Sequence, residues 1–112
     1  MTVSTHVLDS VAGTPAPGVS VALSMRDADG SWLPVEAGVT DADGRLRFAA
    51  ETTGAVYRLT FGTGLYFANR RVATFYPEVV ITFSSFTLDG TPGHYHVPLL
   101  LAPYAYSTYR GS

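Results

Sequence analysis

The chain has 112 residues, of which 46% are hydrophobic and 14% charged, with no cysteine and a formal net charge of −2. This length suits a single domain, residues 1–112, with a core of its own, and the missing cysteines exclude disulfides, thiolate catalysis and cysteine-ligated zinc. The small negative charge favours neither nucleic acid nor an anionic membrane as a partner.

The low charged fraction also bears on assembly, because soluble monomers usually carry about a quarter charged residues. It predicts that part of the surface is buried against other copies of the chain. No apolar run approaches the roughly 18 residues that span a bilayer. The first residues, Met1 to His6, lack the basic and apolar regions of a signal peptide, so we expect a cytoplasmic protein.

Alternating apolar and polar residues predict about eight short strands. The clearest alternation runs from Val19 to Met25. The Gly- and Pro-rich stretch 13–18 and the two Asp-x-Asp-Gly sequences at 27–30 and 41–44 are typical of turns. The predicted strands span residues 3–9, 19–25, 32–40, 45–48, 56–61, 78–86, 94–101 and 104–109.

Residues 63–74 are the one predicted helix, because their apolar positions 65, 66, 68 and 72 follow helical spacing. Phe75-Tyr-Pro77 is expected to end this helix, since the residue before a proline disfavours the helical region. Short strands with turns about every 8–12 residues and a single helix predict an all-β sandwich.

The two Asp-x-Asp-Gly sequences invite a comparison with calcium-binding loops. A twelve-residue calcium loop ends in a glutamate, but the corresponding places hold Gly38 and Thr52. We therefore predict ordinary tight turns and no calcium site.

Period-2 alternation separates two faces of the predicted first and last strands. Tyr95, Val97, Leu99 and Leu101 suit the core, which turns His94, His96, Pro98 and Leu100 outward. A sheet face that also carries Leu8 is too apolar for free solvent, so we expect another subunit to close a groove over it. The outward face is predicted to include His6, His96, Leu100, Ser107 and Tyr109.

Each candidate has an ordinary explanation as well. His94 follows the turn at 91–93, and we expect it to be a plain surface residue. Arg45 follows a tight turn, where an exposed arginine is common, and Tyr109 can serve packing alone. Ser107 lacks the companions of a catalytic nucleophile, and no His-Glu-x-x-His cluster occurs, so we predict neither covalent catalysis nor a metal or other cofactor.

Segments at both ends and in the middle of the chain carry a resemblance to a known family. The N-terminal one is His6-Val-Leu-Asp9 followed by Gly13-Thr-Pro-Ala-Pro-Gly-Val19, and the C-terminal one runs from Tyr95 to Ser112. With Asp43-Gly-Arg-Leu46 and Phe75-Tyr-Pro-Glu-Val79 between them, the whole chain resembles the transthyretin-like family. The resemblance implies a prealbumin-like sandwich of two four-stranded sheets with one short helix. It also implies a homotetramer with sites in the channel between paired dimers.

Within this family the closing Tyr109-Arg-Gly-Ser112 resembles the hydrolase branch and not the hormone carriers. His6, Arg45 and His96 also stand where the carriers have Lys, Glu and Thr. This likeness implies hydrolysis of 5-hydroxyisourate to 2-oxo-4-hydroxy-4-carboxy-5-ureidoimidazoline in urate degradation. Ala102 departs from the Ser that many relatives have there, but it lies in a turn.

The hydrolase resemblance implies roles for five residues. His6 and His96 would orient and deprotonate water, with either one as the base, and Arg45 would stabilise the negative charge that develops on the substrate. His6, Arg45, Tyr109 and Ser112 would bind the substrate, the last through its terminal carboxylate. The alternatives are a carrier of a small aromatic ligand in the tetramer channel and a sandwich that serves assembly alone.

Overall fold

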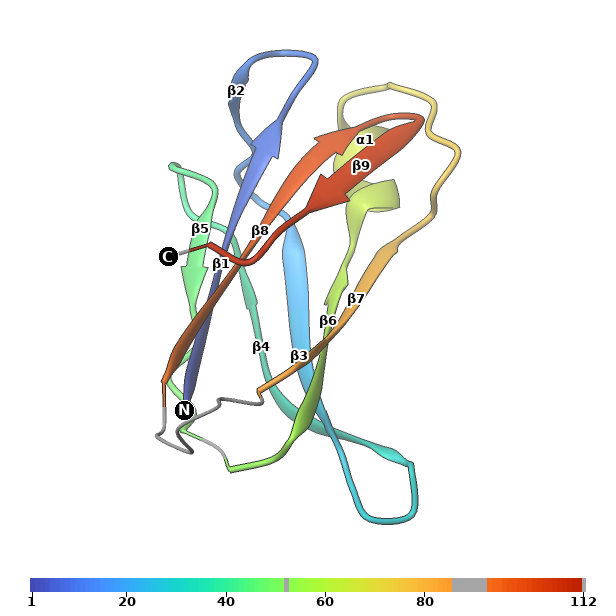
Figure 1. Ribbon diagram of the computed structural model, residues 1–112. Helices are drawn as coiled ribbons and strands as arrows, with labels where there is room; N and C mark the ends of the chain where they lie inside the picture. Colours follow the sequence, from blue (N-terminus) through green and yellow to red (C-terminus); the bar gives the residue numbers. More distant parts are fainter. Residues whose placement is uncertain (52, 86–92, 112) are drawn as a thin grey trace.

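The computed structural model describes residues 1–51, 53–85 and 93–111 and places nine strands in two sheets (Figure 1). The first sheet has the order β2-β1-β8-β9, with β5 also paired to β1, and the second has the order β4-β3-β6-β7. The first sheet contains β1 (Thr2–Asp9), β2 (Thr14–Pro15), β5 (Arg45–Arg47), β8 (His94–Ala102) and β9 (Ala105–Thr108). The second contains β3 (Ser20–Arg26), β4 (Trp32–Val39), β6 (Val56–Phe61) and β7 (Val79–Ser84).

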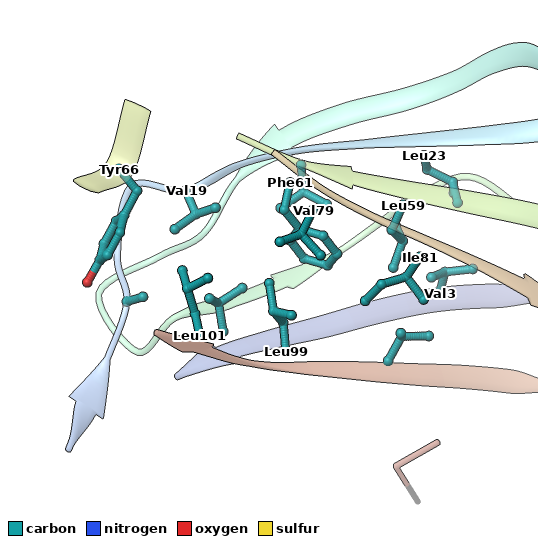
Figure 2. Packing of buried hydrophobic residues seen from close by; sticks show 14 of the residues in the cluster. Val3, Val19, Leu23, Leu59, Phe61, Tyr66, Val79, Ile81, Leu99 and Leu101 are labelled. Carbon is teal, nitrogen blue, oxygen red and sulfur yellow. The ribbon is translucent and has the colours of Figure 1, made fainter. Parts of the chain in front are cut away.

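The core lies between the two sheets and follows the predicted alternation (Figure 2). On β1 the odd-numbered residues are buried and the even-numbered ones are half-buried, so one face packs inward while the other is left to partners or solvent. The first sheet contributes Val3, Val7, Leu99 and Leu101, and the second contributes Val21, Leu23, Leu59, Phe61 and Val79. The predicted all-β sandwich is therefore confirmed.

The parallel pair β1–β8 forms the centre of the first sheet. It matches Thr2 with His94 at one end and Asp9 with Leu101 at the other. Strand β9 then pairs antiparallel with β8, and β5 pairs antiparallel with β1 on its opposite edge. Two strands that are far apart in the sequence thus set their outward side chains next to each other.

A tight turn before β5 fixes that strand against β1. The Asp41 carboxylate accepts hydrogen bonds from the backbone N–H groups of Asp43 and Arg45, at 2.9 and 3.0 Å. Gly44 adopts a φ of 75°, and its carbonyl accepts the Val7 N–H at 2.8 Å. The Asp-x-Asp-Gly sequence is therefore a turn, as predicted, and it places Arg45 directly opposite His6 on β1.

The strand boundaries agree with the predictions to within two residues wherever the structure describes the chain. The predicted end of the 78–86 strand lies outside the described residues, and β7 spans Val79–Ser84. The predicted four strands per sheet hold for the second sheet. The first sheet gains β2, because Thr14–Pro15 in the predicted turn region pairs with the end of β1.

The helix is shorter than predicted: α1 spans Thr63–Asn69 and not 63–74. It ends because Arg71 adopts a left-handed conformation with φ 58°, and the Val72 N–H then donates to the carbonyl of Phe67 at 3.0 Å. This arrangement caps the helix end. Glycine usually occupies the left-handed position, so an arginine there gave no signal in the sequence. Within the part of the chain that the structure describes, no helix meets the length and hydrophobicity that a membrane-spanning helix needs.

We predict that Gly44→Ala lowers the free energy of unfolding by more than Gly30→Ala does. Both glycines have positive φ, which costs any L-residue about 1–2 kcal/mol. Only at Gly44 would the new methyl collide with a backbone atom, the Val7 carbonyl oxygen, whereas Gly30 has open space. Urea titrations at equal protein concentration should separate the two variants by at least about 1 kcal/mol. Equal losses would contradict this account of the turn.

Candidate active site

The outward face of the first sheet gathers polar side chains from three adjacent strands. Strand β1 contributes Ser4 and His6, and its partner β8 contributes His96 opposite Ser4. On the other edge of β1, β5 places Arg45 opposite His6. Because side chains alternate across a strand, all of these point away from the core.

A pocket of about 340 Å³ lies on this face. It is lined by Ser4, Thr5, Asp41, Arg45, Leu46, Arg47, His94 and His96. Asp41 is the one carboxylate among these lining residues, against two guanidinium groups and two imidazoles. Such a lining suits a small polar molecule with carbonyl oxygens or negative charge.

His96 lies in the pocket as a neutral imidazole at neutral pH. Its burial is the main cause of a lowered pKa, and the nearby charges of His6, His94 and Arg45 lower it further. One ring nitrogen, Nδ1, is joined to the Ser4 hydroxyl at 2.8 Å. A neutral histidine with its other nitrogen available can accept a proton, as a general base must.

His6 stands beside this pocket and its tautomer follows from its partner. Its Nε2 lies 2.9 Å from the carbonyl oxygen of Asp43 in the turn before β5. A carbonyl only accepts hydrogen bonds, so Nε2 carries the proton and Nδ1 of a neutral His6 keeps a free lone pair. The same turn thus orients both His6 and Arg45.

The turn also sets the charge next to the site. The pKa of Asp41 is lowered, first by the hydrogen bond from the Arg45 backbone N–H, and also by the Asp43 N–H and the charges of Arg45 and His6. Asp41 therefore stays an anion, and it holds the turn that carries Arg45 into the pocket.

The C-terminal segment packs against His96. The Gly111 N–H donates to the His96 carbonyl at 2.8 Å, and a methyl group on Gly111 would meet the His96 ring at 2.5 Å. Tyr109 is 57% exposed and lines a different hollow, beside Tyr95 and Arg110. The structure thus brings His96 and Arg45 into one pocket with His6 beside it. It does not bring Tyr109 there, and Ser112 lies outside the described residues.

Six of the lining residues were not expected in the site from the sequence, among them Ser4, Arg47 and His94. We expected His94 to be a plain surface residue, but its ring lines the pocket and bonds to Ser4 at 2.7 Å. Alternation had already placed His94 on the face of His96. What the sequence lacked was the identity of the neighbouring strands, which puts Ser4 and Arg47 beside that face.

No group of three or more His, Cys, Asp or Glu side chains among the described residues is placed to hold a metal ion.

Comparison with known proteins identifies the family. The model of the HIUase/Transthyretin family matches residues 3–111. The chain belongs to this family. A 5-hydroxyisourate hydrolase of Caulobacter vibrioides is 46% identical, over 97% of this chain and 96% of the relative. This membership confirms the resemblance inferred from the sequence.

Two solved structures of the family show how far its fold is shared. The Klebsiella pneumoniae 5-hydroxyisourate hydrolase superposes with a TM-score of 0.83 and 39% identity, covering all of both chains. Transthyretin from Sparus aurata gives a TM-score of 0.86 and 34% identity, covering 97% of this chain and 95% of its own. The backbones of the hydrolase and of the transthyretin therefore fit this chain about equally well. Any functional distinction between them must come from side chains.

We predict that His96 titrates with a pKa below the 6.5 of a free histidine and that Arg45→Gln raises it, because one positive neighbour is removed. Following the ring C–H resonances by NMR between pH 4 and 8 measures this. The sign for stability follows. As pH falls below about 6.5 the unfolded chain takes up the proton first, so the contribution of His96 to stability is lost toward acid pH. A His96 pKa above 6.5 would contradict the assignment.

Proposed function

We propose that this chain hydrolyses 5-hydroxyisourate to 2-oxo-4-hydroxy-4-carboxy-5-ureidoimidazoline, a step of urate and purine degradation. The observation that carries the proposal is the pocket in which His96 and Arg45 lie together, with His6 at its side. Relatives from bacteria and from Mus musculus named 5-hydroxyisourate hydrolase support it. The substrate is a flat, carbonyl-rich heterocycle, which suits a pocket rich in hydrogen-bond donors.

In the proposed reaction a water attacks a ring amide carbonyl of the substrate. A neutral histidine, His96 or His6, takes a proton from this water as it attacks. Negative charge develops on the carbonyl oxygen, and the fixed charge and planar donors of Arg45 stabilise it. The C–N bond of the ring then breaks, and the ring nitrogen leaves as an N–H after receiving the proton.

Tyr109 and Ser112 remain predicted substrate-binding residues. The packing of Gly111 against His96 brings the C-terminal segment to the wall of the site, which supports a role for this segment. Tyr109 lies two positions before that contact. A cytoplasmic location, expected from the sequence, also stays a prediction.

The alternative is a carrier that binds a small aromatic ligand in a channel between subunits. Such a site would be lined mainly by apolar side chains. The lining here includes Arg45, Arg47, His94 and His96, which favours the hydrolase. A catalyst also needs a neutral base at neutral pH, and the lowered pKa of His96 meets that need.

We further propose that the chain forms a homotetramer whose subunits cover the outward face of the first sheet. This face presents the half-buried side chains of Leu8 and Leu100, which are direct neighbours in the parallel pair β1–β8. Apolar side chains on the outer side of a sheet are typical of a surface that meets another subunit.

We predict that the protein accelerates the decay of 5-hydroxyisourate, generated from urate by urate oxidase and followed by ultraviolet absorbance. His96→Ala and Arg45→Ala should each lower kcat/KM by about 10²–10⁴-fold, because they remove the base or the oxyanion donor. Arg26→Gln, an exposed arginine of the second sheet, is the matched control and should keep full activity. Decay no faster than the spontaneous rate would overturn the proposal.

For the assembly, we predict a sedimentation mass of about four times the 12.0 kDa chain. Leu100→Asp should dissociate it, because a buried unpaired charge is costly at an interface. Leu33→Asp, on β4 of the second sheet and 42% exposed, should not. A monomeric wild-type protein at micromolar concentration would contradict the tetramer while leaving the hydrolase test unaffected.

A further inference from the structure

A chain of hydrogen bonds crosses the outward face beside the proposed base, and the reaction outlined above does not use it. The Thr2 hydroxyl lies 2.6 Å from Nδ1 of His94, and Nε2 of His94 lies 2.7 Å from the Ser4 hydroxyl. The same Ser4 hydroxyl lies 2.8 Å from Nδ1 of His96. Ser4 therefore bridges two histidines that are two positions apart on β8.

The geometry of this chain follows from the parallel register of β1 and β8. Thr2 is opposite His94, and Ser4 is opposite His96. Alternation sends all four side chains to the same outward face, where His94 and His96 both border the pocket. The register therefore places the Ser4 hydroxyl within hydrogen-bond distance of both imidazole rings.

The protons in this chain can be counted. A hydroxyl donates one hydrogen bond and can accept two, and a neutral imidazole has one N–H and one lone pair. The three contacts therefore have three consistent arrangements. In the first, His96 Nδ1–H donates to Ser4, Ser4 donates to His94 Nε2, and His94 Nδ1–H donates to Thr2. In the second, every bond is reversed. In the third, both His94 Nε2–H and His96 Nδ1–H donate to Ser4, and Thr2 donates to His94 Nδ1. Because Ser4 cannot donate to both rings, the tautomers of His94 and His96 are not independent.

The first and third arrangements put the proton of His96 on Nδ1 and leave its Nε2 with a lone pair. The second puts the proton on Nε2 and makes His96 a donor there. Both histidines must be neutral for the count to hold, and burial together with the positive neighbours of each keeps both pKa values below the usual histidine value. These neighbours are Arg47 for His94, and His6, His94 and Arg45 for His96.

We infer that Ser4 and His94 are positioning residues that fix the orientation and tautomer of His96, with the proton on Nδ1 and the lone pair on Nε2. The functional part of this inference rests on the proposed hydrolase activity, because a general base needs the lone pair on Nε2. His94 acts through Ser4 and touches neither the water nor the substrate. The tautomer itself is a property of the free protein and is measurable without any reaction.

The deciding experiment is a long-range proton–nitrogen NMR correlation of the ¹⁵N-labelled full chain at pH 7.5, which reports the tautomer of each histidine. We expect His96 to be protonated on Nδ1 in the wild type. Ser4→Ala removes the hydroxyl, and His94→Ala removes its far partner, so both should shift His96 toward a mixture of tautomers. Ser107→Ala is the matched control, since Ser107 is exposed on the same face and opposite Leu100.

Kinetics with 5-hydroxyisourate supply the second readout. Ser4→Ala should lower kcat about 10- to 100-fold with little change in KM, a loss of the size found when the partner that orients a metal-bound histidine is removed. Ser4→Thr keeps a hydroxyl on a residue that suits strands and should restore most of the rate. Unchanged amide spectra elsewhere in the protein show that Ser4→Ala still folds.

The outcomes separate this inference from the proposed function. A His96 protonated on Nε2 in the wild type, or a tautomer that ignores Ser4→Ala, overturns the positioning role even if the enzyme is active. A Ser4-dependent Nδ1 tautomer in a protein without hydrolase activity upholds the tautomer assignment and overturns the proposed function. Equal losses of kcat in Ser4→Ala and Ser4→Thr would also count against the hydroxyl.

Discussion

The parallel pairing of β1 with β8 is the constraint on which the rest of the molecule depends. Its register joins eight residue pairs, from Thr2 with His94 to Asp9 with Leu101. Because strands alternate, this one register decides both faces at once. It sends Val3, Val7 and Leu99 into the core and sets His6 and His96 on the outer surface. A slip of either strand by one residue would turn its histidine inward and its core residues outward, so stability and the site depend on the same register.

The second constraint is electrostatic. The pocket gathers two arginines and two histidines around a single carboxylate, Asp41. Positive neighbours disfavour the charged form of an imidazole, which adds to the effect of burial and keeps His96 neutral. The electrostatic repulsion among these four basic side chains is smaller than their number suggests, because His94 and His96 are neutral. The positive groups that would stabilise an oxyanion in the proposed reaction thus also keep the proposed base, His96, unprotonated.

The sequence predicted which face of a strand each side chain occupies better than it predicted which strands lie side by side. Alternation is a local property, so the core side of β8 and the outward side of His96 could be read from the chain. Pairing is not local, and nothing in the residues said that Ser4 would meet both His94 and His96. The helix end was missed for a different reason. The left-handed position that ends the helix is occupied by Arg71, and glycine is the residue expected there. The roles predicted for His6, Arg45 and His96 came from the resemblance to a family, because alternation alone assigns no chemistry to a residue.

Hydrolase and transthyretin structures fit this backbone almost equally, with TM-scores of 0.83 and 0.86. The fold therefore sets a place for a ligand, and the side chains decide what happens there. In this chain few positions determine the chemistry, because the first sheet gathers their side chains in or beside one pocket. Nε2 of His6 bonds to the Asp43 carbonyl and Nδ1 of His96 to the Ser4 hydroxyl, so the scaffold holds one nitrogen of each histidine. The proposed hydrolysis uses the other nitrogen of one of them as the base, and a site that only binds a ligand does not need this division.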